Sequence, residues 1–228
     1  NDSRTRNLPA DAKEKWRLFK KYNKRDVETE MAIQERLKKF PVPESEWENY
    51  VIDQEINDRG ILVDTTFVTQ AICCDERSKA VCLERAQNLT DLENPNSPFQ
   101  LMDWLRGEGL SVESLAKSEV TKMLKTATGD VREVLELRQQ LSKTSVKKYM
   151  AMEAVTSTDQ RARGLFQFYG ANRTGRFAGR LIQLQNLPQN HLAQLKEVRT
   201  LVKDGDFDLL DMLYDSTSDV LSQLIRTS

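Results

Sequence analysis

The chain has 228 residues, of which 30% are charged, and a mean hydropathy of -0.60. This length allows one large or two small domains with a hydrophobic core. No apolar run reaches the roughly 18 to 20 residues of a membrane span and no signal-peptide pattern opens the chain, so we expect an intracellular, cytoplasmic protein with no membrane partner.

The net charge of -1 conceals a strong segregation of charge along the sequence. Residues 161–200 carry seven Lys or Arg against one acid, and residues 137–152 carry four against none. Residues 44–64 and 201–228 are acidic instead. A nearly neutral chain with two concentrated basic stretches is typical of a protein that binds nucleic acid on one surface.

Cysteine and histidine offer little chemistry in this sequence. Cys73, Cys74 and Cys82 form no recognisable metal-ligand spacing, and their odd number favours buried or half-buried thiols in a reducing compartment. The chain has one histidine, His191. We therefore expect neither histidine-based catalysis nor zinc chemistry.

Residues 11–40 form the first predicted helix, which we expect to be interrupted near Tyr22 and Asn23. Tyr22 and Asp26 are four residues apart, so a helix would place the phenol and the carboxylate on one face. A solvated helix face is the simplest interpretation of this pair. The apolar anchors of the helix are predicted to be Val27, Met31, Leu37 and Phe40.

The next helix is predicted after the proline pair at positions 41 and 43. Ser45 is a candidate N-cap, and Gly60 follows the last helical residue. We expect Trp47, Val51 and Ile56 to face inward.

Three more helices are predicted before residue 126. One covers residues 66–89 and contains the cysteines. Ser97 is predicted to cap a short helix whose first residue is Pro98. A further short helix covers residues 114–125.

A long helix is predicted from Asp130 to about Val155. At 1.5 Å per residue it would be about 38 Å long. A solvated basic face is common on helices, but surface helices normally carry paired charges, so a cluster without acids favours contact with an anion. The second half of this helix carries such a cluster, Arg138, Lys143, Lys147 and Lys148.

Residues 164–170 are the clearest predicted strand, because aromatic residues lie between two glycines with partial alternation. The strand leads into residues 169–188, Y-G-A-N-R-T-G-R-F-A-G-R-L-I-Q-L-Q-N-L-P, which contain three arginines and three glycines but no acid. Glycine allows close approach of the backbone to a ligand, and arginine offers a fork of donors to phosphate or bases. We expect an anion to bind here, although a surface loop with solvated arginines would have the same composition.

Within this segment, Ile182 and Leu184 alternate with Gln183 and Gln185. This period of two predicts an extended segment with both amides on one face, ending at Asn186. Amide side chains can contact the minor groove of a duplex, where acceptors occupy similar places in every base pair. Further helices are predicted at residues 191–203, 206–214 and 216–226.

The segment from Arg173 to Pro188 resembles the T-G-R-L-S-S-x-x-P-N-L-Q-N-I-P motif of family A DNA polymerases, the DNA polymerase I type. The middle differs, since F-A-G replaces L-S-S, Ile182 replaces Pro and Gln183 replaces Asn, and Leu187 stands for the isoleucine. The matching positions are Thr174, Gly175, Arg176, Leu184, Gln185, Asn186 and Pro188.

Weaker resemblances extend over nearly the whole chain. The Y-N-K-R-D segment is similar to the third motif of proofreading 3′-5′ exonuclease domains, which implies that Asp26 ligates a catalytic divalent metal and that Tyr22 orients the attacking water. Residues 53–64 resemble the junction between exonuclease and polymerase, and N-S-P-x-Q-L and residues 138–149 resemble thumb motifs. The L-Y-D-x-x-x-D-V-L-S-Q-L-I-R-T stretch is similar to the bacteriophage or prophage branch.

The resemblance implies a mainly α fold with a small β element (α+β). It divides the chain into the end of a 3′-5′ exonuclease domain (1–42), a helical connector and thumb (43–160), and the start of a palm (161–228). The parent protein would be a DNA-directed DNA polymerase, a nucleotidyltransferase of DNA replication that uses Mg²⁺ and dNTPs. This segment would lack the palm carboxylates and the first two exonuclease motifs, so we expect it neither to be catalytic alone nor to bind the metal.

The role expected for the segment itself is to hold primer-template DNA. Lysines and arginines would neutralise phosphates, while Arg176, at the primer-terminal base pair, would contact the minor groove together with the template-side amides. The expected DNA-binding residues are Arg138, Lys143, Lys147, Lys148, Arg173, Thr174, Arg176, Arg180, Gln183, Gln185 and Asn186.

Two other interpretations stay open. The chain could be a non-catalytic helical protein-interaction module, in which the arginine-rich segment is incidental. Alternatively, residues 161–228 could pair with a second copy through an unpaired sheet edge.

Overall fold

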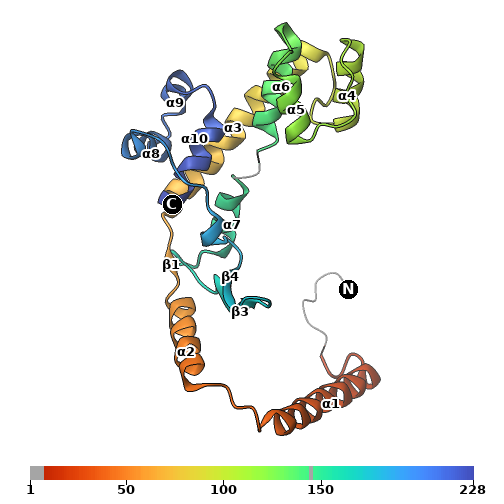
Figure 1. Cartoon of the computed structure of the whole chain (residues 1–228), viewed down its shortest axis with the longest axis vertical. Coiled ribbons are helices and arrows are strands. Elements are labelled where there is room, and N and C mark those ends of the chain that lie inside the picture. The colour runs from red at the N-terminus through yellow and green to blue at the C-terminus, as the bar shows by residue number, and fades with distance from the viewer. Residues whose placement is uncertain (1–7, 144–145) are drawn as a thin grey trace. The chain divides into compact units, whose positions relative to one another are not determined.

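A computed structural model of the chain describes residues 8–143 and 146–228. In this part of the chain helices predominate, and the strands form two small two-stranded sheets (Figure 1). The predicted fold class, mainly α with a small β element, is therefore confirmed. None of the described helices has both the length and the apolar character needed to cross a membrane.

The chain divides into two compact units, Asn1–Ile52 and Asp53–Ser228. Unit 1 contains helix α1 (Lys13–Leu37), which is continuous, so the predicted interruption near Tyr22 is wrong. Neither proline nor glycine occurs in α1, and pairs such as Arg17–Glu14 and Lys24–Glu28, both 3.8 Å apart, support the helix along its surface.

The apolar residues of α1 are not core anchors. None of the described residues of this helix is buried. The exposed fractions of the predicted anchors range from 48% for Val27 to 78% for Phe40, because none of the elements described in unit 1 covers them. The prediction that Val27, Met31, Leu37 and Phe40 are apolar anchors is therefore wrong.

Helix α2 (Glu44–Arg59) begins one residue before the predicted cap and is followed by Gly60, as expected. Trp47 and Val51 are 52% and 53% exposed, so their predicted inward position is wrong, whereas Ile56 is half-buried. Only the second part of α2 belongs to unit 2, where it has partners to pack against.

Unit 2 is built around helix α3 (Thr65–Thr90). This helix contacts α6 (Gly129–Leu141), α7 (Lys147–Val155), α8 (Leu195–Asp204) and α10 (Thr217–Leu224). Cys74 and Cys82 are buried as predicted, but Cys73 is exposed. Burial raises the pKa of Cys74 to about 12, so that thiol stays neutral at physiological pH.

A second hydrophobic cluster joins α4 (Pro98–Gly107), α5 (Lys117–Met123) and α6. Ser97 caps α4 by accepting a hydrogen bond from Gln100 N at 3.5 Å, and Pro98 is the first helical residue, as predicted. Helix α5 starts later than expected because the Ser114 hydroxyl accepts from Ala116 N and forms a turn there.

The long helix predicted from residue 130 to 155 is instead two helices, α6 and α7. At the end of α6 the Ser142 hydroxyl donates to Gln139 O, and Lys143 N donates to Gln140 O, three residues back. This tighter turn and the competing hydroxyl end the helix. The predicted basic cluster is therefore divided: Arg138 is on α6, Lys143 follows the end of α6, and Lys147 and Lys148 are on α7.

The sheets connect segments that are distant in sequence or adjacent through a turn. Strand β1 (Ile61–Leu62) pairs with β2 (Arg161–Ala162), and β3 (Phe166–Ala171) pairs with β4 (Arg176–Gly179), both antiparallel. Strand β3 confirms the predicted strand. The last elements are η1 (Leu184–Asn186), α8, α9 (Phe207–Leu213), α10 and η2 (Ile225–Thr227).

The main core of unit 2 contains residues from both sides of position 160. Tyr149 of α7 is fully buried, lies 5.9 Å from the ring of Phe67, and donates to Leu221 O of α10 at 2.7 Å. Residues predicted to belong to the thumb and to the palm thus pack in one unit. The assignment of domains to ranges 1–42, 43–160 and 161–228 stays a prediction.

Asp64 connects the start of α3 to α8. Its carboxylate caps α3 through Phe67 N at 3.1 Å and accepts from Arg199 at 2.7 Å and Lys203 at 2.6 Å. Partial burial raises its pKa, but the hydrogen bonds from Lys203, Arg199 and the Phe67 amide outweigh burial and lower the pKa to about 2. The charged form therefore stabilises the fold.

We expect Asp64→Asn to lower the free energy of unfolding at pH 7 by about 1 to 2 kcal/mol, a value reduced for partial exposure to solvent. Because the pKa is lower in the folded state, this contribution is present above pH 4 and is lost as the pH falls towards 2. Urea unfolding between pH 2 and 7 measures it. Glu76→Gln, on the exposed face of α3, is the control, and equal loss in both variants would contradict the assignment.

Candidate nucleic-acid interface

The β3–β4 hairpin carries the arginines of the predicted DNA-binding segment. Thr174 N and Gly175 N both donate to Ala171 O at 3.0 Å, which closes the turn. Gly175 has a φ of +64°, and a Cβ atom there would lie 2.9 Å from the Tyr169 ring. The turn therefore requires glycine at this position.

A bulge changes the register of the hairpin between Gln167 and Ala171. Tyr169 lies in this bulge with a φ of 51°, an uncommon conformation for an aromatic residue. Phe168 contacts the rings of Tyr169 and Phe177 with centroid distances of 5.1 and 5.6 Å. Aromatic packing thus stabilises the irregular strand that precedes the arginines.

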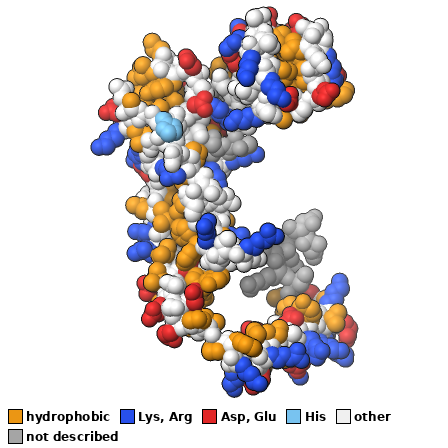
Figure 2. Space-filling view, viewed as in Figure 1, with side chains coloured by type: hydrophobic (Ala, Val, Ile, Leu, Met, Phe, Trp, Pro, Cys, Tyr) orange, Lys and Arg blue, Asp and Glu red, His pale blue; other side chains and the backbone are white. Residues whose placement is uncertain are grey.

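The predicted contact residues of the hairpin are available to a ligand. Arg173, Thr174, Arg176 and Arg180 are all exposed. Within the described residues, no carboxylate pairs with any of the three guanidinium groups. Figure 2 shows Lys and Arg side chains over the β3–β4 region. This surface can accept an anion without first breaking an ion pair.

The amide-bearing segment after the hairpin is not extended, so that prediction is wrong. Residues Leu184–Asn186 form a 3-10 turn, and Leu181 and Gln183 have φ angles of 53° and 56°. The alternation nevertheless corresponds to burial, because Ile182 is 1% exposed while the neighbouring amides face solvent. Asn186 donates to the Gln183 side chain at 3.5 Å.

Cationic side chains bind the backbone at both ends of this amide segment. Lys148 of α7 donates to Ile182 O at 2.9 Å. Arg226 donates to Leu187 O at 2.7 Å and to Pro188 O at 2.8 Å. The left-handed conformation of Leu181 and Gln183 is unfavourable for residues other than glycine, so the surrounding contacts must stabilise this backbone. We call Gln183, Gln185 and Asn186, held between these bonds, the amide turn.

The bond between Lys148 and Ile182 also joins the basic helix to the predicted DNA-binding segment. Lys147, the preceding residue, is exposed, whereas Lys148 is half-buried. Lys148 thus has a positioning role that its expected phosphate contact did not include. Its ammonium retains two further donors for an anion.

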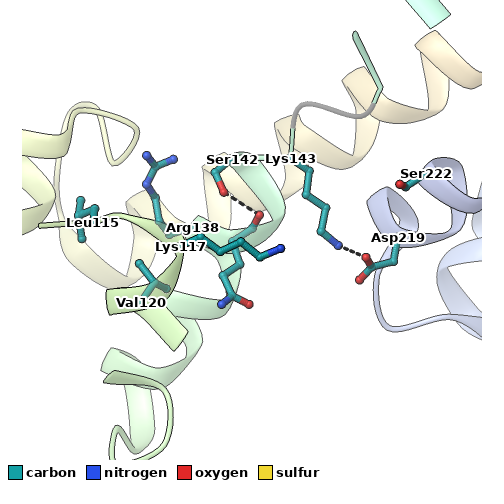
Figure 3. A pocket seen from close by; sticks show the side chains of 9 residues that line it. Leu115, Lys117, Val120, Arg138, Ser142, Lys143, Asp219 and Ser222 are labelled. Carbon is teal, nitrogen blue, oxygen red and sulfur yellow. Dashed lines mark hydrogen bonds and ion pairs between the residues drawn. The ribbon is translucent and has the colours of Figure 1, made fainter. Parts of the chain in front are cut away.

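Arg138 and Lys143 lie apart from Lys147, in a pocket of about 520 Å³. Figure 3 shows the side chains of this pocket, which come from α5, the end of α6 and α10. Lys143 forms an ion pair with Asp219, and Nε of Arg138 is buried with no hydrogen-bond partner among the described atoms. We call it the cationic pocket; it is lined by Leu115, Lys117, Val120, Arg138, Gln139, Ser142, Lys143, Asp219 and Ser222.

Asn57 of α2 binds the outer edge of the hairpin, a contact that the sequence did not predict. Its side chain donates to Phe166 O at 3.1 Å and accepts from Phe166 N at 3.0 Å, as a neighbouring strand would. Asp53, which is 2% exposed, accepts from the same Asn57 amide at 3.2 Å. An asparagine inside an acidic helix carries no periodic signal, so sequence patterns could not identify this clamp.

Tyr22 and Asp26 lie on the continuous helix α1, one turn apart and both exposed. Their predicted position on one helix face is consistent with this geometry. Among the described residues, no group of three or more His, Cys, Asp or Glu could hold a metal ion. The residues around Asp26 therefore do not fit a divalent metal by themselves, and the metal role of Asp26 stays a prediction.

The chain is similar over its whole length to a DNA polymerase of Bacillus phage SP02. The two are 49% identical over 229 residues, which cover 100% of this chain and 35% of the phage protein. The chain thus spans about a third of the length of this relative. No protein-family model matches the chain, and no solved structure matches it significantly.

The expected relation to a phage DNA polymerase is therefore confirmed by a relative that bears this name. Assignment to family A and the roles of the individual site residues stay predictions. The structure brings the hairpin, the amide turn and α7 into contact, while Arg138 and Lys143 line a separate pocket.

We expect Asn57→Ala to loosen the hairpin, because Phe166 N and O would lose their partner and Asp53 would lose one of its donors. Loss of these bonds should cost about 1 to 3 kcal/mol of unfolding free energy. Hydrogen exchange of the hairpin amides and urea unfolding measure the two effects. Asn88→Ala, exposed on α3, is the control, and unchanged exchange at Phe166 would contradict the clamp.

Proposed function

We propose that this chain is part of a family A DNA-directed DNA polymerase of DNA replication, and that its own contribution is to hold primer-template DNA. The observation that carries the proposal is the surface formed by the exposed hairpin arginines, which pair with no described carboxylate, and by the amide turn, which is fixed to α7 by the bond from Lys148 to Ile182. The similarity to a phage DNA polymerase supports it.

The hairpin and the amide turn would contact the minor groove. Gln185 and Asn186 present donors and acceptors from a backbone held at both ends, and Arg176 presents donors from strand β4. Such fixed groups can recognise the shape and the acceptors shared by all base pairs, which gives binding with little sequence preference. Arg176 would lie at the primer-terminal base pair, and Gln183, Gln185 and Asn186 along the template side.

The remaining basic residues would neutralise phosphates. Lys147, Arg173 and Arg180 are exposed, and Arg138 and Lys143 line the cationic pocket. Thr174 at the turn would add a hydroxyl donor. These residues lie on a hairpin, on a helix and in a pocket, so together they can contact several phosphates of the DNA backbone.

In the complete enzyme we propose that Mg²⁺ supports nucleotidyl transfer from dNTPs at carboxylates outside this chain. Within the proposal, residues 1–42 end the 3′-5′ exonuclease domain, residues 43–160 form the connector and thumb, and residues 161–228 begin the palm. Tyr22 and Asp26 would complete an exonuclease site supplied mainly by other residues. In this proposal the chain holds the DNA, and the polymerase activity of the complete enzyme is proposed from the name of the phage relative.

A protein-interaction module is the second candidate, and one observation favours it. Helix α1 exposes large apolar side chains, among them Leu18 at 68% and Phe19 at 54%. A partner protein could cover them. Capture of a protein from lysate that survives nuclease treatment, by a chain that does not bind duplex DNA, would favour this candidate.

We expect binding of the chain to primer-template DNA to weaken steeply with salt. About three to five phosphate contacts give a slope of about -2.7 to -4.5 in log affinity against log salt, or roughly a 40- to 500-fold loss between 50 and 200 mM. Fluorescence titration with labelled duplexes of two unrelated sequences measures the slope and the sequence preference. A flat salt dependence would contradict phosphate contacts, and a large difference between duplexes would contradict contact by shape.

Replacing Arg176 by Ala should weaken duplex binding about tenfold, or ~1.4 kcal/mol, because it removes a donor fork at the groove without disturbing an ion pair. The same titration measures the loss. Arg36→Ala, exposed on α1, removes the same charge and is the control. If both variants bind as tightly as the unmodified chain, Arg176 does not have the proposed role.

A further inference from the structure

The cationic pocket contains two charged residues that the DNA-binding prediction did not assign, Lys117 and Asp219. In Figure 3 the side chains of Lys117 and Lys143 extend towards the same space beside Asp219, whereas Arg138 turns the other way. Ser142 and Ser222 also line the pocket; the Ser142 hydroxyl already donates to Gln139 O, which leaves that of Ser222 as a neutral donor. Two ammonium groups and a hydroxyl around one space suit a phosphate group.

Asp219 already binds one of the two ammonium groups of the cationic pocket. Its carboxylate forms an ion pair with Lys143 and comes from the first turn of α10, where Ser216 caps the helix. The Asp219 side chain is 61% exposed, while that of Lys143 is 26% exposed. The lysine is thus fixed in the pocket wall, and the carboxylate is the partner that can turn into water.

We propose that the cationic pocket binds one phosphate group of the DNA backbone between Lys117 and Lys143, and that Asp219 competes with this phosphate for Lys143. This inference rests on the proposed function. In the free protein Asp219 neutralises Lys143 and keeps it in place. When the phosphate enters, the Lys143 ammonium exchanges the Asp219 carboxylate for the phosphate. Asp219 then turns to solvent, because a carboxylate and a phosphate beside the same ammonium group repel each other.

The exchange is feasible because a partly exposed ion pair contributes little net stability, so its loss is small compared with a charge-assisted bond to phosphate. Lys117, the second ammonium group of the pocket, is exposed and forms no ion pair with any described carboxylate. The pocket is therefore cationic even while Asp219 is bound. Asp219 reduces its affinity for DNA without closing it.

Asp219→Asn tests the competition. It should tighten binding to duplex DNA three- to tenfold at 100 mM salt, because Lys143 becomes free and a negative charge leaves the site. Asp215→Asn is the matched control, since it removes the same charge from an exposed residue outside the pocket. Equal affinities of the two variants would overturn the proposal, provided that both keep the unfolding temperature of the unmodified chain.

Lys117→Gln tests the new phosphate contact. It should weaken duplex binding and reduce the slope of log affinity against log salt by about one unit. Lys125→Gln, exposed just beyond α5, is its control. A slope that changes equally in both variants would remove Lys117 from the site.

These results separate the pocket from the function. If the chain binds duplex DNA and Arg176→Ala weakens it, while Asp219→Asn equals Asp215→Asn, the pocket proposal fails and the proposed function stands. If the chain does not bind duplex DNA, the proposed function fails and so does the backbone as the source of the phosphate. Inorganic phosphate, compared with chloride at equal ionic strength, then shows whether the pocket stabilises Asp219→Asn more than Asp215→Asn; no difference would overturn the anion site as well.

Discussion

Hydrogen bonds from distant side chains to the backbone of residues 166–188 are the interactions on which this structure depends. Asn57 binds Phe166, Lys148 binds Ile182, and Arg226 binds Leu187. The segment contains several left-handed residues and a bulge, which a free loop would not maintain. These bonds fix the backbone of a glycine-rich segment, so that its guanidinium and amide groups form a defined surface.

Some charged side chains of this chain form ion pairs that stabilise the fold, whereas others are exposed and can bind a ligand. Asp64 binds Arg199 and Lys203 and thereby joins α3 to α8, and Asp219 holds Lys143 in the cationic pocket. The arginines of the hairpin have no such partner within the described residues. A chain with a net charge of -1 can thus have a cationic surface, because acidic residues such as Asp64 pair with other lysines and arginines and not with those of the hairpin.

The end of α6 divides the proposed DNA-binding surface into two parts. Lys147 and Lys148 belong to α7, which contacts the amide turn, whereas Arg138 and Lys143 face α5 and α10. With two elements, one part of the surface can bind the groove while the other binds backbone at a different place along a duplex.

The sequence by itself determined the features that local chemistry controls. Ser97 and Pro98 start α4, glycine closes the hairpin turn, and the apolar and polar alternation around Ile182 corresponds to burial. Only the tertiary structure decided that the apolar face of α1 stays exposed, that residues 130–155 form two helices, and which side chains bind the hairpin. The bonds of Lys148, Arg226 and Asn57 join residues 34, 39 and 109 positions apart, and such separations leave no periodic pattern in a sequence.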